Sequence, residues 1–125
     1  TGACVTARGF ACAGELIRRG GIWRGEELAD AYALGEAIRG SFVEPRAGFG
    51  FWLAAPSRQP MSFDSDLWRA QSPAPIDLAM AAGNGGQRLY IAPSRALVVV
   101  QLTHTDTPGA PWSDAQFLSL LWADL

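Results

Sequence analysis

The stretch DLAMAAGNGGQRLYIAPSRALVVVQL, residues 77–102, decides the fold of this chain. It predicts three strands, at residues 77–82, 87–92 and 97–102. Glycines at positions 83, 85 and 86 suit a tight turn between the first two strands, because glycine adopts positive φ at no steric cost. The β-branched run of the third segment predicts a central, buried strand. Together the segments predict an antiparallel meander.

Two helices are predicted before this meander. Residues 6–19 place apolar side chains near helical spacing, with Thr6 as N-cap and Gly20-Gly21 as the stop. After a turn at residues 23–25, Glu26 and Glu27 are expected to open a second helix that ends before Gly40. The first forty residues are therefore expected to be mostly helical.

A third helix is predicted at residues 114–123. Ser113 and Gln116 have the spacing of a capping box, and Trp112 and Phe117 have the spacing of a hydrophobic staple. The apolar face of this helix is broad enough to lie on a sheet.

The segment between the helical and meander regions mixes aromatic residues, glycines and prolines. Residues 47–54 predict a further strand, and the proline-rich residues 56–75 predict a loop. The order of the elements indicates an α+β fold, with N-terminal helices, an antiparallel sheet and a C-terminal helix packed on the sheet.

The composition fits one domain of 125 residues with a single core, since 49% of the residues are hydrophobic. The net charge of −2 gives no electrostatic basis for binding nucleic acid. The apolar runs are far shorter than the ~20 residues of a membrane-spanning helix, so no membrane span is expected. All ten basic residues are arginine, which excludes lysine as nucleophile, base or Schiff-base former within this chain.

Few residues of this chain suit metal or acid–base chemistry. Cys4 and Cys12 are read as small buried residues too far apart along a helix for a disulfide. One histidine and two separated cysteines make a zinc site improbable without ligands from another chain, and neither a metal nor a cofactor is expected. His104, followed by Asp106, either caps a strand at the surface or completes a serine–histidine–aspartate arrangement.

Two further sets of side chains have more than one interpretation. The acidic residues Asp64, Asp66, Glu26 and Glu27 are read as solvated surface charges rather than paired catalytic carboxylates. Trp52 and Trp68 flank the proline-rich loop and are candidates for contact with a substrate, although tryptophans commonly fill cores.

Three segments resemble one known family. They are TARGFACAGELIRRGGIWRGEEL at residues 6–28, AGFGFWL at residues 47–53 and GNGGQRLYIAPSRALVVVQL at residues 83–102. Their order and spacing resemble serine hydrolases related to class C β-lactamases, D-Ala-D-Ala peptidases and 6-aminohexanoate-oligomer hydrolases. In AGFGFWL, Phe49 and Phe51 replace the tyrosine and glycine of the family pattern.

The resemblance implies an enzyme that cleaves a small-molecule amide or ester through an acyl-serine intermediate. The family's S-x-x-K and Lys-Thr-Gly motifs need lysine, which this chain lacks, and no tyrosine stands in a Y-x-N motif because the only asparagine is Asn84. Residues 1–125 are therefore interpreted as the C-terminal segment of such a domain. The nucleophile is expected from a missing N-terminal portion of the same domain or from a second chain, so the 125 residues alone are expected to be inactive.

By the same resemblance, the Asn84 backbone N–H is one of two oxyanion-hole donors, on the strand that borders the catalytic serine. Gly83, Asn84 and Gly85 are then expected to contact the substrate. A simpler interpretation is a tight hairpin whose glycines serve only the backbone. A different class of function also stays open, namely a non-catalytic binding or interaction domain on the same scaffold.

Overall fold

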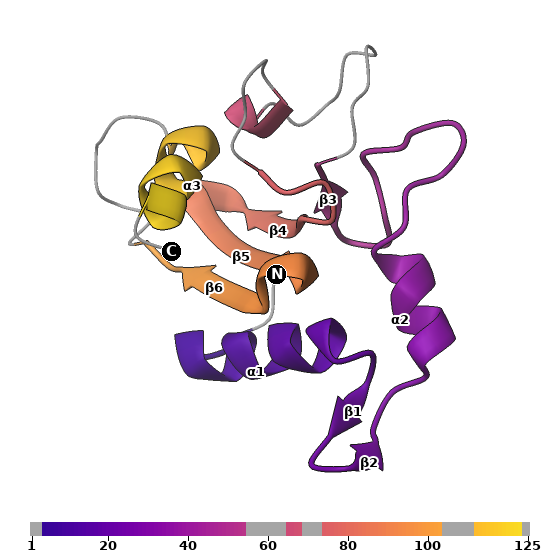
Figure 1. Ribbon diagram of the computed structural model, residues 1–125. Helices are drawn as coiled ribbons and strands as arrows, with labels where there is room; N and C mark the ends of the chain where they lie inside the picture. Colours follow the sequence, from indigo (N-terminus) through magenta and orange to yellow (C-terminus); the bar gives the residue numbers. More distant parts are fainter. Residues whose placement is uncertain (1–3, 55–64, 69–73, 104–111, 124–125) are drawn as a thin grey trace.

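A computed structural model describes residues 4–54, 65–68, 74–103 and 112–123 of the chain. The fold is α+β, with three α-helices and two antiparallel sheets in the described residues (Figure 1). The helices are α1 (Ala7–Arg18), α2 (Ala31–Ala37) and α3 (Asp114–Ala123). The strands are β1 (Ile22–Trp23), β2 (Glu26–Glu27), β3 (Trp52–Leu53), β4 (Ala79–Gly83), β5 (Gln87–Ala92) and β6 (Leu97–Gln101), with short 3-10 turns η1 (Asp66–Trp68), η2 (Asn84–Gly86) and η3 (Pro93–Arg95). The α+β class predicted from the sequence is confirmed.

The main sheet has the order β3-β4-β5-β6, and α1 and α3 cover its two faces (Figure 1). In the register, Tyr90 of β5 pairs with Met80 on one side and Val99 on the other. Successive side chains of a strand point to opposite faces. Accordingly, Leu89 and Ile91 lie against α1, while Tyr90 lies under α3. This is why β5 is buried along almost its whole length.

The core on the α3 side contains Leu67, Leu78, Met80, Tyr90, Ala92 and Leu118. On the α1 side, the helix approaches the sheet at Gly14, the buried residue of α1. A Cβ atom on Gly14 would lie only 2.7 Å from Cγ1 of Val98 and 2.9 Å from Cδ1 of Leu89. The absence of a side chain at this position therefore sets the helix–sheet distance.

The helix termini at α1 and α3 agree with the sequence predictions. The Thr6 hydroxyl accepts from the Gly9 N–H at 3.1 Å, and Gly20 and Gly21 follow the helix with positive φ. At α3, the Ser113 hydroxyl accepts from the Gln116 N–H at 3.0 Å. The rings of Trp112 and Phe117 lie 5.2 Å apart, as the hydrophobic staple predicts.

The predicted start of the second helix is wrong. Arg24 and Gly25 both have positive φ, so the chain reverses and Glu26–Glu27 pairs with Ile22–Trp23 as β2. The helix begins only after Asp30, whose carboxylate accepts from the Ala33 N–H at 2.7 Å. A two-residue turn with positive φ at both positions matches the twist of paired strands. Glu26 and Glu27 therefore form a strand instead of the first turn of a helix.

Two strand predictions are also corrected. The strand expected at residues 47–54 is limited to β3, because the chain turns at residues 48–51 and the Gly48 N–H donates to the Phe51 carbonyl at 2.8 Å. The strand expected at 97–102 ends at Gln101 and is half-buried at the edge of the described sheet rather than central. The central position belongs to β4 and β5.

Cys4 and Cys12 are both exposed and unpaired, so the prediction that they are buried is wrong. Cys12 lies on α1 two residues before Gly14, which faces the sheet, and this spacing turns its side chain toward solvent. Of the loop predicted at residues 56–75, only the segment around η1 and the last residues belong to the described part of the chain.

Candidate functional site

The candidate site is the hairpin turn between β4 and β5, which we call the glycine turn (residues 83–86). Gly83 ends β4 in an extended conformation, and Gly85 and Gly86 have φ values of 71° and 81°. Asn84 has no positive φ and is exposed, as are Gly83 and Gly85. The structure thus places Gly83 at the end of a strand, and Asn84 and Gly85 in the turn itself rather than on the strand.

Side chains from three sides restrain the glycine turn. The Thr103 hydroxyl donates to the Gly85 carbonyl. The Gln87 amide bonds the Thr103 backbone twice, donating to its carbonyl at 2.7 Å and accepting from its N–H at 3.2 Å. A Cβ atom on Gly86 would lie 3.2 Å from Cβ of Trp112, so this glycine packs closely against the segment before α3.

The third restraint comes from Arg88, the first residue of β5 that is fully buried. Its Nη1 donates to the carbonyl of Gln87 at 3.0 Å and, at 3.4 Å, to the carbonyl of Gly83. The other side of the guanidinium meets Asp114: Nε donates to Oδ1 at 2.8 Å and Nη2 to Oδ2 at 3.4 Å. One planar group therefore joins the turn to the first residue of α3.

Asp114 is the centre of a buried polar cluster. Its carboxylate is 1% exposed and accepts from Tyr90 at 2.5 Å, from Ser65 at 2.6 Å and from Trp112 at 3.1 Å, in addition to Arg88. Trp112 also donates to the Tyr90 hydroxyl oxygen at 2.9 Å. Because charged groups are costly to bury without partners, this complete set of donors explains why an ion pair is stable inside the fold.

The cluster shifts the pKa of two of its members. Burial raises the pKa of Asp114, but the hydrogen bonds from Arg88, Ser65 and Tyr90 outweigh that effect and keep the pKa below its ordinary value. Burial and the adjacent Asp114 carboxylate raise the pKa of the Tyr90 hydroxyl. The cluster is therefore a charged carboxylate surrounded by protonated donors, an arrangement that fixes geometry and offers no free base.

Asp66 does not have the solvated role assigned to it from the sequence. Its carboxylate accepts from the Ser113 hydroxyl and, at 2.9 Å, from the Ala115 N–H. Asp66 therefore caps α3 together with Ser113. Its carboxylate lies at the N-terminal end of the helix, where the helix dipole is positive and an acidic group is stabilising. Asp64, His104 and Asp106 lie outside the described residues.

Trp52 and Trp68, the predicted aromatic contacts, lie together but away from the glycine turn. Their rings form an edge-to-face pair with centroids 6.0 Å apart, and the Trp68 indole N–H donates to the Leu53 carbonyl at 2.8 Å. Both are half-buried against the core. Trp52 pairs with Met80, three residues before Gly83, which is about 10 Å along the strand.

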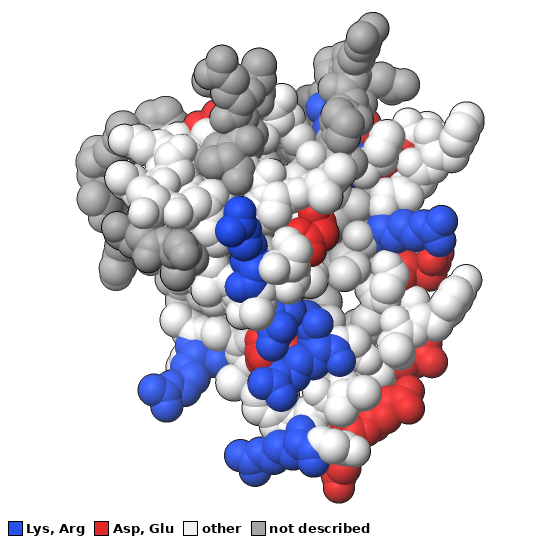
Figure 2. All heavy atoms as spheres, viewed as in Figure 1, with Lys and Arg blue, Asp and Glu red and all other residues white. Residues whose placement is uncertain are grey.

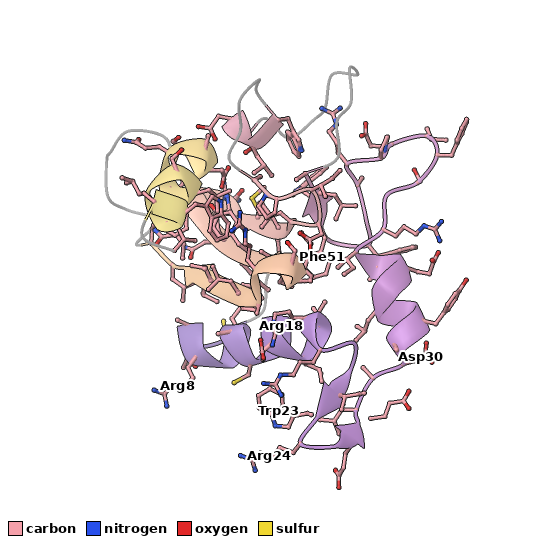
Figure 3. The ribbon with its side chains drawn as sticks, in the orientation of Figure 1. Arg8, Arg18, Trp23, Arg24, Asp30 and Phe51 are labelled. Atoms are coloured by element: carbon pink, nitrogen blue, oxygen red, sulfur yellow. The ribbon has the colours of Figure 1, made fainter. Side chains whose placement is uncertain are left out.

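Arginines gather on the side formed by α1 and the β1–β2 hairpin (Figure 2). Arg8 and Arg24 project outward from this side in Figure 3, and Arg18 lies over α1. Glu15 accepts from Arg18 at 2.6 and 2.7 Å and from Arg19 at 2.6 Å. These hydrogen bonds lower the pKa of Glu15 to about 2, and they hold the charges of Arg18 and Arg19 against the helix.

The buried cluster is the part of the site that the sequence analysis missed. Its members are Ser65, Arg88, Tyr90, Trp112 and Asp114. The sequence contained one indication of it, namely Arg88 inside a strand whose other residues are mostly apolar. The sequence pattern does not show which residue pairs with this arginine.

Within the described ranges, no helix is long and apolar enough to cross a membrane. In the same ranges, no group of three or more histidine, cysteine and acidic side chains is arranged to hold a metal ion. Comparison of the chain with protein-family models, curated proteins and solved structures finds no match.

Proposed function

We propose that this chain is the C-terminal part of a β-lactamase-related serine hydrolase that cleaves a small-molecule amide or ester through an acyl-serine intermediate. The observation that carries the proposal is the glycine turn: a surface turn with an exposed Asn84, restrained by side chains of Thr103, Arg88 and Trp112. The sequence resemblance assigns the Asn84 backbone N–H to the oxyanion hole, and the restraint of the turn supports that assignment.

An oxyanion donor needs to be fixed before the reaction begins. A donor aimed at the developing alkoxide is worth roughly 3–4 kcal/mol in the transition state, provided that no reorganisation is needed when the charge forms. Small residues on both sides of Asn84 leave the backbone open to a ligand. Gly83, Asn84 and Gly85 are then the substrate contacts from this chain, with Trp52 and Trp68 as more distant candidates.

The nucleophile in this proposal comes from another stretch of polypeptide. The described serine hydroxyls donate to carboxylates or to main-chain carbonyls within this fold: Ser65 to Asp114, Ser94 to Asp77, Ser113 to Asp66, Ser41 to Glu44 and Ser119 to Ala115. Carboxylates and carbonyls at these positions orient a hydroxyl, whereas an activated nucleophile needs a neighbouring base such as lysine or histidine.

The test of the proposal uses the complete hydrolase, in which a serine outside these 125 residues is present. A fluorescent penicillin or fluorophosphonate is expected to label that serine, and to leave the 125-residue chain unlabelled. An adduct on a serine of this chain, or none on the complete protein, would contradict the proposal.

The role of Asn84 is tested by removing its N–H. Asn84→Pro deletes the donor, and the Gly83 ψ of 168° suits a residue that precedes proline. We expect kcat to fall about 10²- to 10³-fold. Asn84→Ala is the matched control, because it removes the side chain and keeps the N–H. Equal activity of the two variants would show that the N–H is not an oxyanion donor.

A second function, a non-catalytic interaction domain, is favoured by one observation. Large apolar side chains of α2 and residues 42–49 are strongly exposed, with Tyr32 at 77%, Phe42 at 103% and Phe49 at 84%. Large exposed apolar groups are typical of contact surfaces where they form one patch. This alternative predicts that the complete protein binds a partner through these residues while no serine reacts with the probe.

A further inference from the structure

We propose that Arg88, held by Asp114, is the positioning residue of the glycine turn. This inference rests on the proposed function, because it gives the turn a support that keeps the Asn84 N–H in one place. It concerns a residue that touches neither the nucleophile nor the Asn84 N–H itself.

The guanidinium of Arg88 reaches both ends of the turn. Arg88 is 6% exposed, and its Nη1 reaches the carbonyls of Gln87 at 3.0 Å and Gly83 at 3.4 Å. These carbonyls belong to the residues on either side of the turn, which pair with each other across the hairpin. An arginine that bonds both carbonyls fixes the two ends of the turn relative to each other.

The guanidinium itself is held on its other side by Asp114. Its Nε donates to Oδ1 of Asp114 at 2.8 Å and its Nη2 faces Oδ2 at 3.4 Å. Tyr90 and Ser65 hold the carboxylate from two other directions, at 2.5 and 2.6 Å. The orientation of Arg88 therefore follows from a carboxylate that is immobilised by several donors.

The restraints lie where the backbone of the turn has the most conformational freedom. Gly85 and Gly86 have left-handed φ values, and a turn of consecutive glycines has many accessible backbone states in the absence of restraints. The restraints lie at Gly83, Gly85 and Gly86, on both sides of Asn84. The backbone on both sides of Asn84 is thus held by side chains from other parts of the fold.

The experiment compares Arg88→Lys with Tyr90→Phe. Lysine keeps the positive charge beside Asp114, but a single ammonium group lacks the planar fork that reaches the turn and the carboxylate together. Tyr90→Phe removes one donor to Asp114 and leaves the bonds of Arg88 to the turn in place. Ser65, Trp112 and Arg88 still bind the carboxylate in Tyr90→Phe, so this variant is the matched control for losing one hydrogen bond of the cluster without losing the fork of Arg88.

The measurement is the backbone ¹⁵N order parameter of residues 83–86 in the 125-residue chain. Wild type and Tyr90→Phe are expected to keep values near 0.85, and Arg88→Lys is expected to fall below about 0.6 while α1 keeps its rigid values. Rigid values in Arg88→Lys, or equal loosening in Tyr90→Phe, would overturn the inference.

A wild-type measurement covers the case in which Arg88→Lys does not fold. A guanidinium that is hydrogen-bonded on both sides rotates slowly, so the Nη protons of Arg88 are expected to give separate NMR signals. Scalar couplings are expected across the hydrogen bonds from Nη1 to the carbonyl carbons of Gly83 and Gln87. A single averaged signal would contradict the fork.

In the complete hydrolase, Arg88→Lys is expected to lower kcat with little change in KM. If Asn84→Pro leaves kcat unchanged, the oxyanion role of the Asn84 N–H fails, and the order parameters still decide the positioning role of Arg88.

Discussion

Replacing Gly14 by alanine is expected to destabilise the fold, although alanine is the better helix former. Gly14 lies in the middle of α1, where alanine gains about 1 kcal/mol over glycine in helix propensity. In this position the new Cβ would lie 2.7 Å from Cγ1 of Val98 and 2.9 Å from Cδ1 of Leu89. The favourable distance between carbon atoms is about 3.5–4.0 Å, so the helix and the sheet have to separate by roughly 1 Å.

The size of the effect follows from these contacts. Overpacking of a well-packed core costs about 1–3 kcal/mol, and the upper half of that range applies because Val98 is stiff at χ1 and Leu89 is buried. Subtracting the helix-propensity gain leaves a net loss of about 1–2 kcal/mol. For a domain of this length that corresponds to a fall in Tm of about 4–8 °C.

The assay is chemical and thermal unfolding of Gly14→Ala beside Gly35→Ala. Gly35 lies in α2, where a Cβ atom would meet nothing within 4 Å. Gly35→Ala is therefore expected to stabilise the chain by up to about 1 kcal/mol. In Gly14→Ala/Val98→Ala the clash with Val98 is removed and the contact with Leu89 remains, so the double variant is expected to be more stable than the sum of the single changes by at least about 0.5 kcal/mol. The reasoning would be refuted if Gly14→Ala stabilised the chain, or if the double-mutant cycle of Gly14→Ala and Val98→Ala showed no coupling energy.

Three further predictions concern backbone strain, pH and the buried cluster. Ala96 has a left-handed backbone with a φ of 51°, so Ala96→Gly is expected to raise the free energy of unfolding by about 0.5–1 kcal/mol in urea titrations, and a loss would contradict it. Glu15→Gln is expected to cost about 0.5–1 kcal/mol at pH 7. Because the pKa of Glu15 is lowered from 4.5 to about 2, this difference is expected to disappear as unfolding is measured at pH values falling from 4.5 toward 2, and a gap that persists near pH 2 would exclude the ion pair as its cause. Asp114→Ala leaves Arg88 buried without its carboxylate and is expected to cost about 3–5 kcal/mol, against about 1 kcal/mol for Tyr90→Phe; equal costs would show that the charge pair is not the main term.

Local signals in the sequence predicted the elements that depend on neighbouring residues. The bounds of α3 follow from Ser113, Gln116 and the Trp112–Phe117 contact, all within one helical turn or slightly more. The strand at 87–92 is confirmed with the same bounds as β5. In both places the contacts that determine the element join residues close in the sequence or in neighbouring strands of a hairpin. A local sequence pattern can therefore predict them.

The errors have a common physical origin in contacts between distant residues. The β-branched run at 97–102 predicts burial, but a strand's place in the sheet depends on its partners, and β6 lies at the edge of the sheet formed by the described residues. The pair of Arg88 with Asp114 joins residues 26 positions apart, and Ser65 joins the same carboxylate from 49 positions away. Spacing rules for helices and strands do not reach across such separations.

The position of the polar cluster explains how one sheet combines a dry core with a restrained surface turn. Along β4, burial falls from complete at Ala79 and Met80 to exposed at Gly83, so the strand pair leaves the core as it approaches the turn. Apolar side chains at that end would cover the turn without bonding its carbonyls, because only donors such as Arg88 and Thr103 bind main-chain oxygens directly. An arginine at this depth in turn needs a buried carboxylate, which the first residue of α3 supplies. Asp114 at the start of α3 is therefore linked through Arg88 to the carbonyls on either side of the turn, so that the start of the helix and the turn around Asn84 belong to one hydrogen-bonded arrangement.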